Sequence, residues 1–160
     1  MSLRDNLNKK FGNPAKDLPA FEKNNMSVWN CQKEFPTLPF KKMYVNCYLI
    51  PYLQVTFKAL LDADLLDEIK TYGGCWIVRP VRGYKNLLSI HSWGLALDFN
   101  VDQNPLGWDR TKCIKMGLTP FTECFVKVWE DTGWIAGIKF KRFDGMHFER
   151  TKEFGGNQVF

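Results

Sequence analysis

Both histidines of the chain lie close to an aspartate, in two short segments that are far apart in the sequence. The segment SIHSWGLALDFN holds His91 and Asp98, and the segment DGMHFE holds Asp144 and His147. A catalytic zinc ion typically takes three protein ligands from imidazole nitrogens and carboxylate oxygens, and it leaves a fourth position open to water. His91, Asp98 and His147 supply such a set. The two segments therefore predict one shared zinc site.

The spacing within each segment sets a geometric condition. Seven residues separate His91 from Asp98, and three separate Asp144 from His147. In a continuous strand both are odd offsets, which would put the paired side chains on opposite faces. The chain must therefore bend within each segment. A glycine in each segment can provide the turn, because glycine accepts backbone angles that other residues avoid.

Hydrolysis at such a zinc site also needs a base, because the attacking water must pass on a proton. Asp144 is the candidate, since a carboxylate that lies near the metal without ligating it can take that proton and deliver it to the leaving amine. Arg82 is the candidate for stabilising the oxyanion, and Arg79 is the alternative. Each of these side chains by itself is more often an ordinary core or surface residue, so the prediction depends on their combination.

Hydrophobic periodicity predicts the elements that must position these residues. The segment 95–101 alternates between apolar residues on one face and Ala96, Asp98 and Asn100 on the other, which is typical of a half-buried strand. Further strands are expected over 43–50, 75–81, 134–140 and 145–150. One helix is expected over 52–74, where the glycine pair at its end stops it, and a second helix over 119–133, where Thr119 is the N-cap and Pro120 the first helical residue. Strands and helices without regular βαβ alternation indicate an α+β fold.

Length and composition set the remaining bounds. One domain is expected from 160 residues, with an irregular N-terminal wrap over residues 1–40, a core over 41–150 and a tail over 151–160. The formal charge of +5 comes from scattered residues, which argues against a nucleic-acid partner. No run of about 18 apolar residues is present, so no membrane insertion is expected. The five cysteines form no C-x-x-C pair and are expected to be reduced.

The two segments, written as S-x-H-x-x-G-x-A-x-D and D-x-M-H-F-E, resemble the signature of the zinc D-Ala-D-Ala carboxypeptidase and L-alanyl-D-glutamate endopeptidase family, the VanY-like peptidases of family M15. The resemblance spans roughly residues 75–150. It implies a small α+β domain with a central antiparallel sheet flanked by helices, a fold shared with hedgehog signalling domains. It also implies that His91, Asp98 and His147 bind Zn²⁺ and that Asp144 is the catalytic base.

The resemblance extends to residues around the site. Ser89 matches a serine that supports the site, and either Arg79 or Arg82 matches an arginine that faces the substrate. Trp93 is a further candidate for binding the substrate or supporting the site. Many family members have glutamate where this chain has Asp144, and aspartate at this position resembles the bacteriophage endolysin branch. The stretch GWIAGIKF departs from the G-W-x-W-G-G form of the family, which affects one wall of the cleft.

The function that the resemblance implies is hydrolysis of amide bonds in the peptide stems of bacterial peptidoglycan. The expected enzyme is an L-Ala-D-Glu endopeptidase similar to endolysins, acting as a monomer. A D-Ala-D-Ala carboxypeptidase is one alternative, and a non-catalytic zinc-binding interaction domain is an alternative of another class. The N-terminal residues lack the apolar stretch of a secretory signal. We therefore expect synthesis in the cytoplasm and action on the cell wall, as a phage product released through a holin or carried in the virion.

Overall fold

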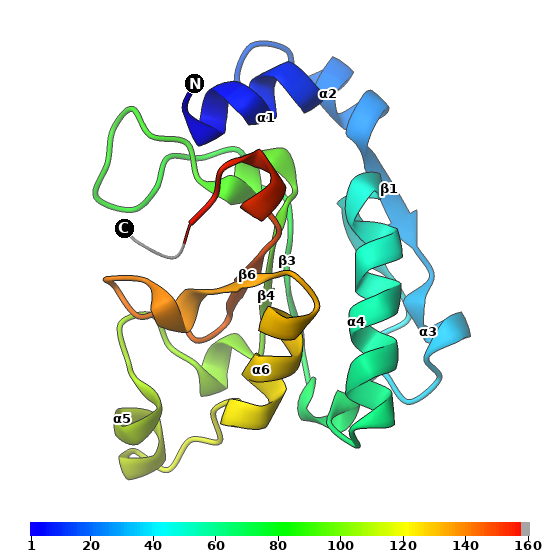
Figure 1. Ribbon diagram of the computed structural model, residues 1–160, viewed down its shortest axis with the longest axis vertical. Coiled ribbons are helices and arrows are strands. Elements are labelled where there is room, and N and C mark those ends of the chain that lie inside the picture. Colours follow the sequence, from blue (N-terminus) through cyan, green and yellow to red (C-terminus); the bar gives the residue numbers. More distant parts are fainter. Residues whose placement is uncertain (158–160) are drawn as a thin grey trace.

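The computed structural model describes residues 1–157 and confirms a small α+β domain with antiparallel sheets and helices (Figure 1). The larger sheet has four strands in the order β3-β4-β6-β5, and β1 and β2 form a separate two-stranded sheet. In chain order the helices and strands are α1 (Leu3–Phe11), α2 (Leu18–Asn25), β1 (Met26–Trp29), α3 (Cys31–Glu34), β2 (Met43–Asn46), α4 (Ile50–Asp62), β3 (Tyr72–Gly74), β4 (Ala96–Phe99), α5 (Arg110–Lys115), α6 (Glu123–Asp131), β5 (Ile135–Ala136) and β6 (His147–Glu149). None of the helices within residues 1–157 is long and apolar enough to cross a membrane.

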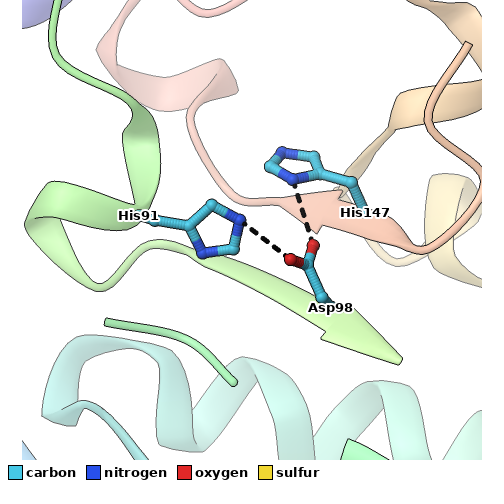
Figure 2. Close-up of side chains that lie close together, drawn as sticks. All are labelled: His91, Asp98 and His147. Carbon is cyan, nitrogen blue, oxygen red and sulfur yellow. Dashed lines mark ion pairs between the residues drawn. The ribbon is translucent and has the colours of Figure 1, made fainter. Parts of the chain in front are cut away.

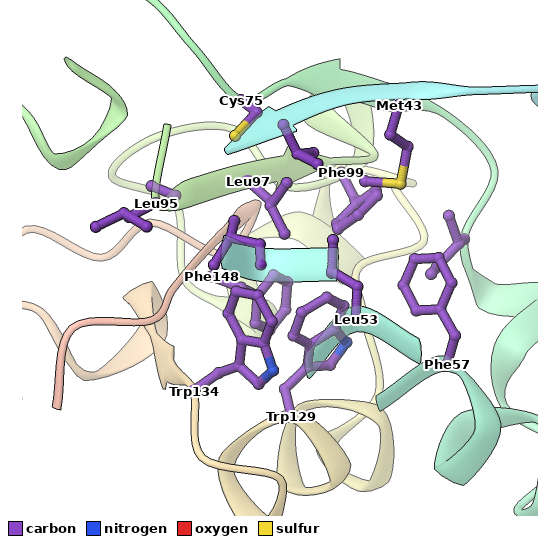
Figure 3. Close-up of a cluster of buried hydrophobic side chains, with 14 of the residues drawn as sticks. Met43, Leu53, Phe57, Cys75, Leu95, Leu97, Phe99, Trp129, Trp134 and Phe148 are labelled. Atoms are coloured by element: carbon purple, nitrogen blue, oxygen red, sulfur yellow. The ribbon is translucent and has the colours of Figure 1, made fainter. Parts of the chain in front are cut away.

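The apolar face of the four-stranded sheet packs against α4 and α6 (Figure 3). The apolar residues at alternate positions from 95 to 99 and the core residues of both helices are fully buried: Leu53, Phe57, Leu95, Leu97, Phe99, Phe125 and Trp129. The strand is shorter than the predicted segment 95–101, because β4 ends at Phe99 and Val101 is 37% exposed. The predicted polar face is also covered, since Ala96 and Asn100 are buried. The ring of Trp129 stacks on Phe148 of β6, with ring centroids 4.5 Å apart. All five cysteines are free, as predicted. Because successive strand residues face opposite sides, this packing turns Asp98 and His147 to the other face of the sheet.

Helix α4 is shorter than the sequence predicts. The apolar spacing continues to Ile69, but the helix ends at Asp62. Asp64 adopts a left-handed backbone conformation with φ of 56°, which cannot continue a right-handed helix. Leu66 and Ile69 are still buried, because a short 3-10 turn after the helix returns them to the core.

The predicted strands are also shorter in the structure. β2 ends at Asn46 rather than at residue 50, because the Asn46 side chain caps a 3-10 turn over Cys47–Leu49 that leads into α4. β3 precedes the predicted segment 75–81, where Pro80 forms only an isolated bridge with Leu88. Proline has no N–H to donate to a strand ladder. β5 and β6 each occupy part of the predicted segments 134–140 and 145–150.

Helix α6 has Thr122 as its N-cap, whereas the sequence predicts Thr119. The side chains of Gln103 and Asn104 accept hydrogen bonds from the backbone N–H groups of Thr119 and Phe121, at 2.8 and 3.1 Å. These bonds hold the stretch before Thr122 outside the helix. The preceding segment also contains α5, for which apolar periodicity gives no prediction.

Residues 1–40 contain α1, α2, β1 and α3, which differs from the expected irregular wrap. Helix α1 begins with a capping box between Ser2 and Asp5, and α2 has Asp17 as its N-cap. Caps of this kind stabilise short helices that apolar periodicity does not reveal. The division into wrap, core and tail stays a prediction, and residues 158–160 of the predicted tail lie outside the described residues.

Candidate metal centre

His91 lies in the 3-10 turn Ile90–Trp93, directly before β4. Gly94 ends this turn in a left-handed conformation with φ of 66°. The left-handed conformation favours glycine, and a Cβ atom at Gly94 would lie 2.8 Å from the sulfur of Met26, so a larger residue would also require Met26 to move. The turn bends the chain between His91 and Asp98, as their seven-residue spacing requires.

The register of β4 and β6 joins the two sequence segments. Asp98 and His147 are direct cross-strand partners in this antiparallel pair, so their side chains lie on the same face of the sheet. Ala96 and Glu149 form the next pair on that face. The backbone N–H of His147 donates to the carbonyl of Asp144 at 3.2 Å, which closes the turn before β6. The structure therefore brings both segments to one place.

Three possible metal-ligand atoms face one another there (Figure 2). His91 Nε2 lies 3.4 Å from Asp98 Oδ2, and His147 Nδ1 lies 3.4 Å from Asp98 Oδ1. One ligand atom from each of the three residues lies within 4.8 Å of the others. Two ligand atoms that bind one tetrahedral zinc ion at about 2.1 Å are separated by about 3.4 Å. Each nitrogen–oxygen separation therefore matches that of two ligands on one zinc ion, with His91 next to one oxygen of Asp98 and His147 next to the other.

The hydrogen bonding of Asp98 also fits a metal site. Asp98 Oδ1 is buried and accepts no hydrogen bond within residues 1–157. Leaving a buried carboxylate oxygen without a donor is costly. A cation placed between Asp98 and the two histidines would compensate that oxygen.

The outward-facing nitrogen of each histidine is held by another group. His91 Nδ1 lies 2.8 Å from the carbonyl oxygen of Cys75, so Nδ1 carries the proton and Nε2 is left for a metal. His147 Nε2 lies 2.9 Å from Glu149 Oε2, which leaves Nδ1 for a metal. Such contacts fix the tautomer and orientation of metal-binding histidines.

Glu149 is a site residue that the sequence analysis missed. It is only 2% exposed, and its other oxygen accepts a hydrogen bond from Thr151 Oγ1 at 2.9 Å. A glutamate in an alternating strand usually faces solvent, and the sequence gives no sign that this face is covered. The available signal was its position two residues after His147, which places both side chains on one face.

The charges of the site shift the pKa values of its residues. Burial acts to raise the pKa of Asp98, but the adjacent His147 and His91 outweigh burial and hold it below its ordinary value. Burial acts to lower the pKa of His147, but the carboxylates of Asp98 and Glu149 beside its ring raise it to about 10. Metal-free His147 is therefore a cation at neutral pH, and a metal that binds it must displace a proton.

Asp144 is close enough to the proposed ligands for their charges to shift its pKa, but it is not one of the three possible metal ligands. Burial raises its pKa, and the charge of Asp98 acts in the same direction, whereas His147 and Arg82 oppose the shift. Its Oδ1 atom is buried and has no hydrogen-bond partner in the described part of the chain. A carboxyl group in this environment is suited to accept and release a proton.

Gly137 fixes how Asp144 and His147 approach the end of β5. Its carbonyl oxygen accepts a hydrogen bond from the Asp144 backbone N–H at 3.0 Å. A Cβ atom at Gly137 would lie 3.0 Å from the Cβ atoms of both Asp144 and His147, and it would collide with the Asp144 carbonyl oxygen. Sequence reasoning missed this role. The signal was that Gly137 keeps the first of the two final glycines of the G-W-x-W-G-G form, although its neighbours Ala136 and Ile138 depart from that form.

The two predicted arginines differ in their relation to the site. Arg82 is exposed, and its charge lowers the pKa of Asp144. The guanidinium of Arg79 donates to the carbonyl of Pro80 at 3.2 Å. Of the two guanidinium groups, Arg82 is the one whose charge acts on a site residue, Asp144, within the described residues 1–157. The backbone of Arg79 instead forms two hydrogen bonds with the Ser92 hydroxyl: the Arg79 N–H donates to Ser92 Oγ, and Ser92 Oγ donates to the Arg79 carbonyl.

Ser89 and Trp93 lie on either side of His91 in the turn. The backbone of Ser89 donates to the Arg79 carbonyl and accepts from the Ser92 N–H, both at 2.9 Å. Trp93 is 1% exposed, and its Nε1 donates to Asn8 at 3.2 Å. The role of Trp93 stays a prediction, and its burial and its bond to Asn8 favour support of the site over contact with a substrate.

A separate hollow of about 570 Å³ lies beyond the end of β4. Its lining includes Glu68, Asn100 and Thr122. Glu68 already accepts two hydrogen bonds from Thr122, and Asn100 accepts two from the backbone after α4. None of the three candidate ligands lines this hollow, so it is separate from the candidate metal centre.

Comparison with protein families matches residues 82–150 to a family model described as D-alanyl-D-alanine carboxypeptidase, of peptidase family M15. This segment contains His91, Asp98, Asp144 and His147 and covers less than half of the 160 residues. No curated protein and no solved structure gives a significant match. The part of the chain that carries the candidate metal centre is therefore similar to the M15 peptidases.

Proposed function

We propose that this protein is a zinc metallopeptidase that hydrolyses amide bonds in the peptide stems of bacterial peptidoglycan. The observation that carries the proposal is the convergence of His91 Nε2, Asp98 and His147 Nδ1, with the outer nitrogen of each histidine already bonded. The match of residues 82–150 to a peptidase family supports the same conclusion. All of these ligands come from one chain, so the proposed site needs no residue from a second copy, and we propose that the enzyme acts as a monomer.

The proposed mechanism gives separate tasks to the residues of the site. His91, Asp98 and His147 would hold the zinc ion, which when bound supplies a Lewis acid that polarises the scissile carbonyl and acidifies a water molecule. Asp144 would take the proton of the attacking water on its carboxylate and pass it to the leaving amine. Arg82 would face the developing oxyanion with its positive charge. Glu149 and Cys75 would keep the two histidine rings in place.

We further propose that the scissile bond lies between L-Ala and D-Glu, as in bacteriophage endolysins. Support for this assignment comes from Asp144, an aspartate where many relatives have glutamate. The second candidate is removal of a terminal D-Ala, which the description of the matching family favours. For either bond the proposed place of action is the bacterial cell wall, reached as a phage product through a holin or in a virion.

Mass spectrometry of products from defined muropeptides tests the proposal. The purified protein is depleted of metal with a chelator and then reloaded with zinc. We expect products only from the zinc-loaded protein, and the new terminus identifies the bond that was cut. An Asp144→Asn protein should bind one zinc ion and form no product. A parent protein that binds zinc fully and cuts no muropeptide would instead be a zinc-binding interaction domain.

A further inference from the structure

Two exposed loops beside the metal centre carry a concentration of positive charge. The first basic loop, residues 79–88, holds Arg79, Arg82 and Lys85, and the second basic loop, residues 138–143, holds Lys139, Lys141 and Arg142. Neither loop contains an aspartate or a glutamate. Both project from the same edge of the molecule, at the left of Figure 1.

These six residues account for the whole excess positive charge of the chain. The chain has 22 Lys and Arg residues against 17 Asp and Glu, so the 16 cations outside the two loops are slightly outnumbered by the acids. Within residues 1–157 no ion pair involves any of the six. Unpaired charges that gather at one place favour a ligand of opposite sign.

The first basic loop is anchored to the turn that carries His91. The backbone N–H and carbonyl of Arg79 bond to Ser92 Oγ at 3.2 and 3.1 Å, and Pro80 bridges to Leu88. A further backbone bond of 2.7 Å joins residues 81 and 87. The loop is therefore fixed relative to the centre, and the charge of Arg82 reaches Asp144.

The second basic loop approaches the centre from the side of His147. The ring of Phe140 contacts the ring of His147, with centroids 5.4 Å apart. The loop closes on Gly137, whose carbonyl accepts from the N–H groups of Phe140 and Asp144 at 3.1 and 3.0 Å. Lys139, Lys141 and Arg142 are exposed within this loop. Their charges thus lie next to the proposed base in the sequence and on a loop that contacts a proposed ligand.

We propose that the two basic loops bind carboxylate groups of the substrate peptide, and thereby select acidic peptides over neutral ones. This inference rests on the proposed peptidase function and adds the charge of its substrate. The bound peptide would lie between the loops, with one carboxylate near Lys85 and another near Lys139, Lys141 and Arg142. An extended anionic wall polymer is disfavoured, because the excess charge is confined to the rim of the centre.

The test compares two versions of one stem peptide, with carboxylates either free or converted to carboxamides. The variant of the second loop carries Lys139→Gln, Lys141→Gln and Arg142→Gln. The matched control carries Lys33→Gln, Lys41→Gln and Lys42→Gln. These substitutions also remove three exposed positive charges, one in α3 and two just before β2, and α3 lies at the opposite edge of the molecule in Figure 1. Hydrolysis of both peptides is measured as kcat/KM, and binding is measured with the Asp144→Asn protein.

We expect the second-loop variant to lose about tenfold in kcat/KM on the acidic peptide and less than about twofold on the carboxamide peptide. The matched control should keep the kcat/KM of the parent on both peptides. Equal losses on both peptides, or a loss only on intact walls that carry an anionic polymer, would overturn the inference. Preferential binding of the acidic peptide by Asp144→Asn without hydrolysis by the parent would support the inference and reject the peptidase function. Hydrolysis with no charge preference would do the reverse.

Discussion

Glu149 offers a sharp test of how the metal centre is built, because it touches a proposed ligand without being one. The Glu149→Gln substitution keeps the size of the side chain and removes its charge. Glu149 is 2% exposed, and its two oxygens lie 2.9 Å from His147 Nε2 and 2.9 Å from Thr151 Oγ1. Glutamine can still accept a hydrogen bond, so the substitution mainly removes negative charge behind His147.

The expected size of the effect follows from two opposing changes. Removing a group that orients a metal-binding histidine typically weakens metal binding by about 10- to 100-fold, or roughly 1.4 to 2.8 kcal/mol. The same carboxylate also stabilises the proton on His147, whose pKa is about 10, and this proton competes with the metal. The carboxylate attracts the zinc ion, with two positive charges, more strongly than the single proton, so removing the carboxylate should lower the net affinity for zinc. We expect about a tenfold loss of zinc affinity at neutral pH, increasing as the pH rises towards 9.

The assay is competition for zinc between the metal-free protein and a chromophoric chelator at several pH values. Glu68→Gln is the matched control, because Glu68 accepts hydrogen bonds from Thr122 in a similar way but lies away from the centre. The control should bind zinc as the parent does. Zinc affinity of Glu149→Gln within about twofold of the parent across this pH range would refute the argument that Glu149 supports His147.

Three further predictions concern the same architecture. Gly137→Ala should lower activity on peptidoglycan by about 100-fold, because the added Cβ collides with the backbone of Asp144 and displaces the base, and kinetics with zinc at saturation would measure this loss. The metal-free protein should lose stability as the pH rises from about 6.5 to about 10, since the pKa of His147 is raised above its unfolded value and the stabilising charge is lost on deprotonation; thermal unfolding across this range would check the sign. Trp129→Ala should destabilise the fold by about 3 to 5 kcal/mol in urea unfolding, because a fully buried ring that stacks on Phe148 is removed.

The ligand set could be predicted from the sequence because its chemistry depends on residue types that are scarce in this chain. Only two histidines exist, and each lies near an aspartate. The odd spacing of His91 and Asp98 also predicted a bend, and Gly94 provides it. Alternation around Asp98 predicted β4 for a similar reason, since a half-buried strand leaves a period of two in its sequence.

The missed features depend on contacts between distant segments. Glu149 is buried only because β6 pairs with β4, and Gly137 is required only because Asp144 folds back onto it. The end of α4 was missed because the apolar spacing continues past Asp64, whose left-handed conformation is a local backbone property. Periodicity reports which residues are buried, and it does not report whether a helix or a following turn buries them.

The central claim is that one zinc ion binds to His91 Nε2, Asp98 and His147 Nδ1. Crystals of the zinc-loaded protein, measured at the zinc absorption edge, test this claim most directly. We predict a single anomalous peak per chain between these three side chains, with the hydrogen bond from His147 Nε2 to Glu149 intact. A peak elsewhere, or coordination of zinc through His147 Nε2, would contradict the account.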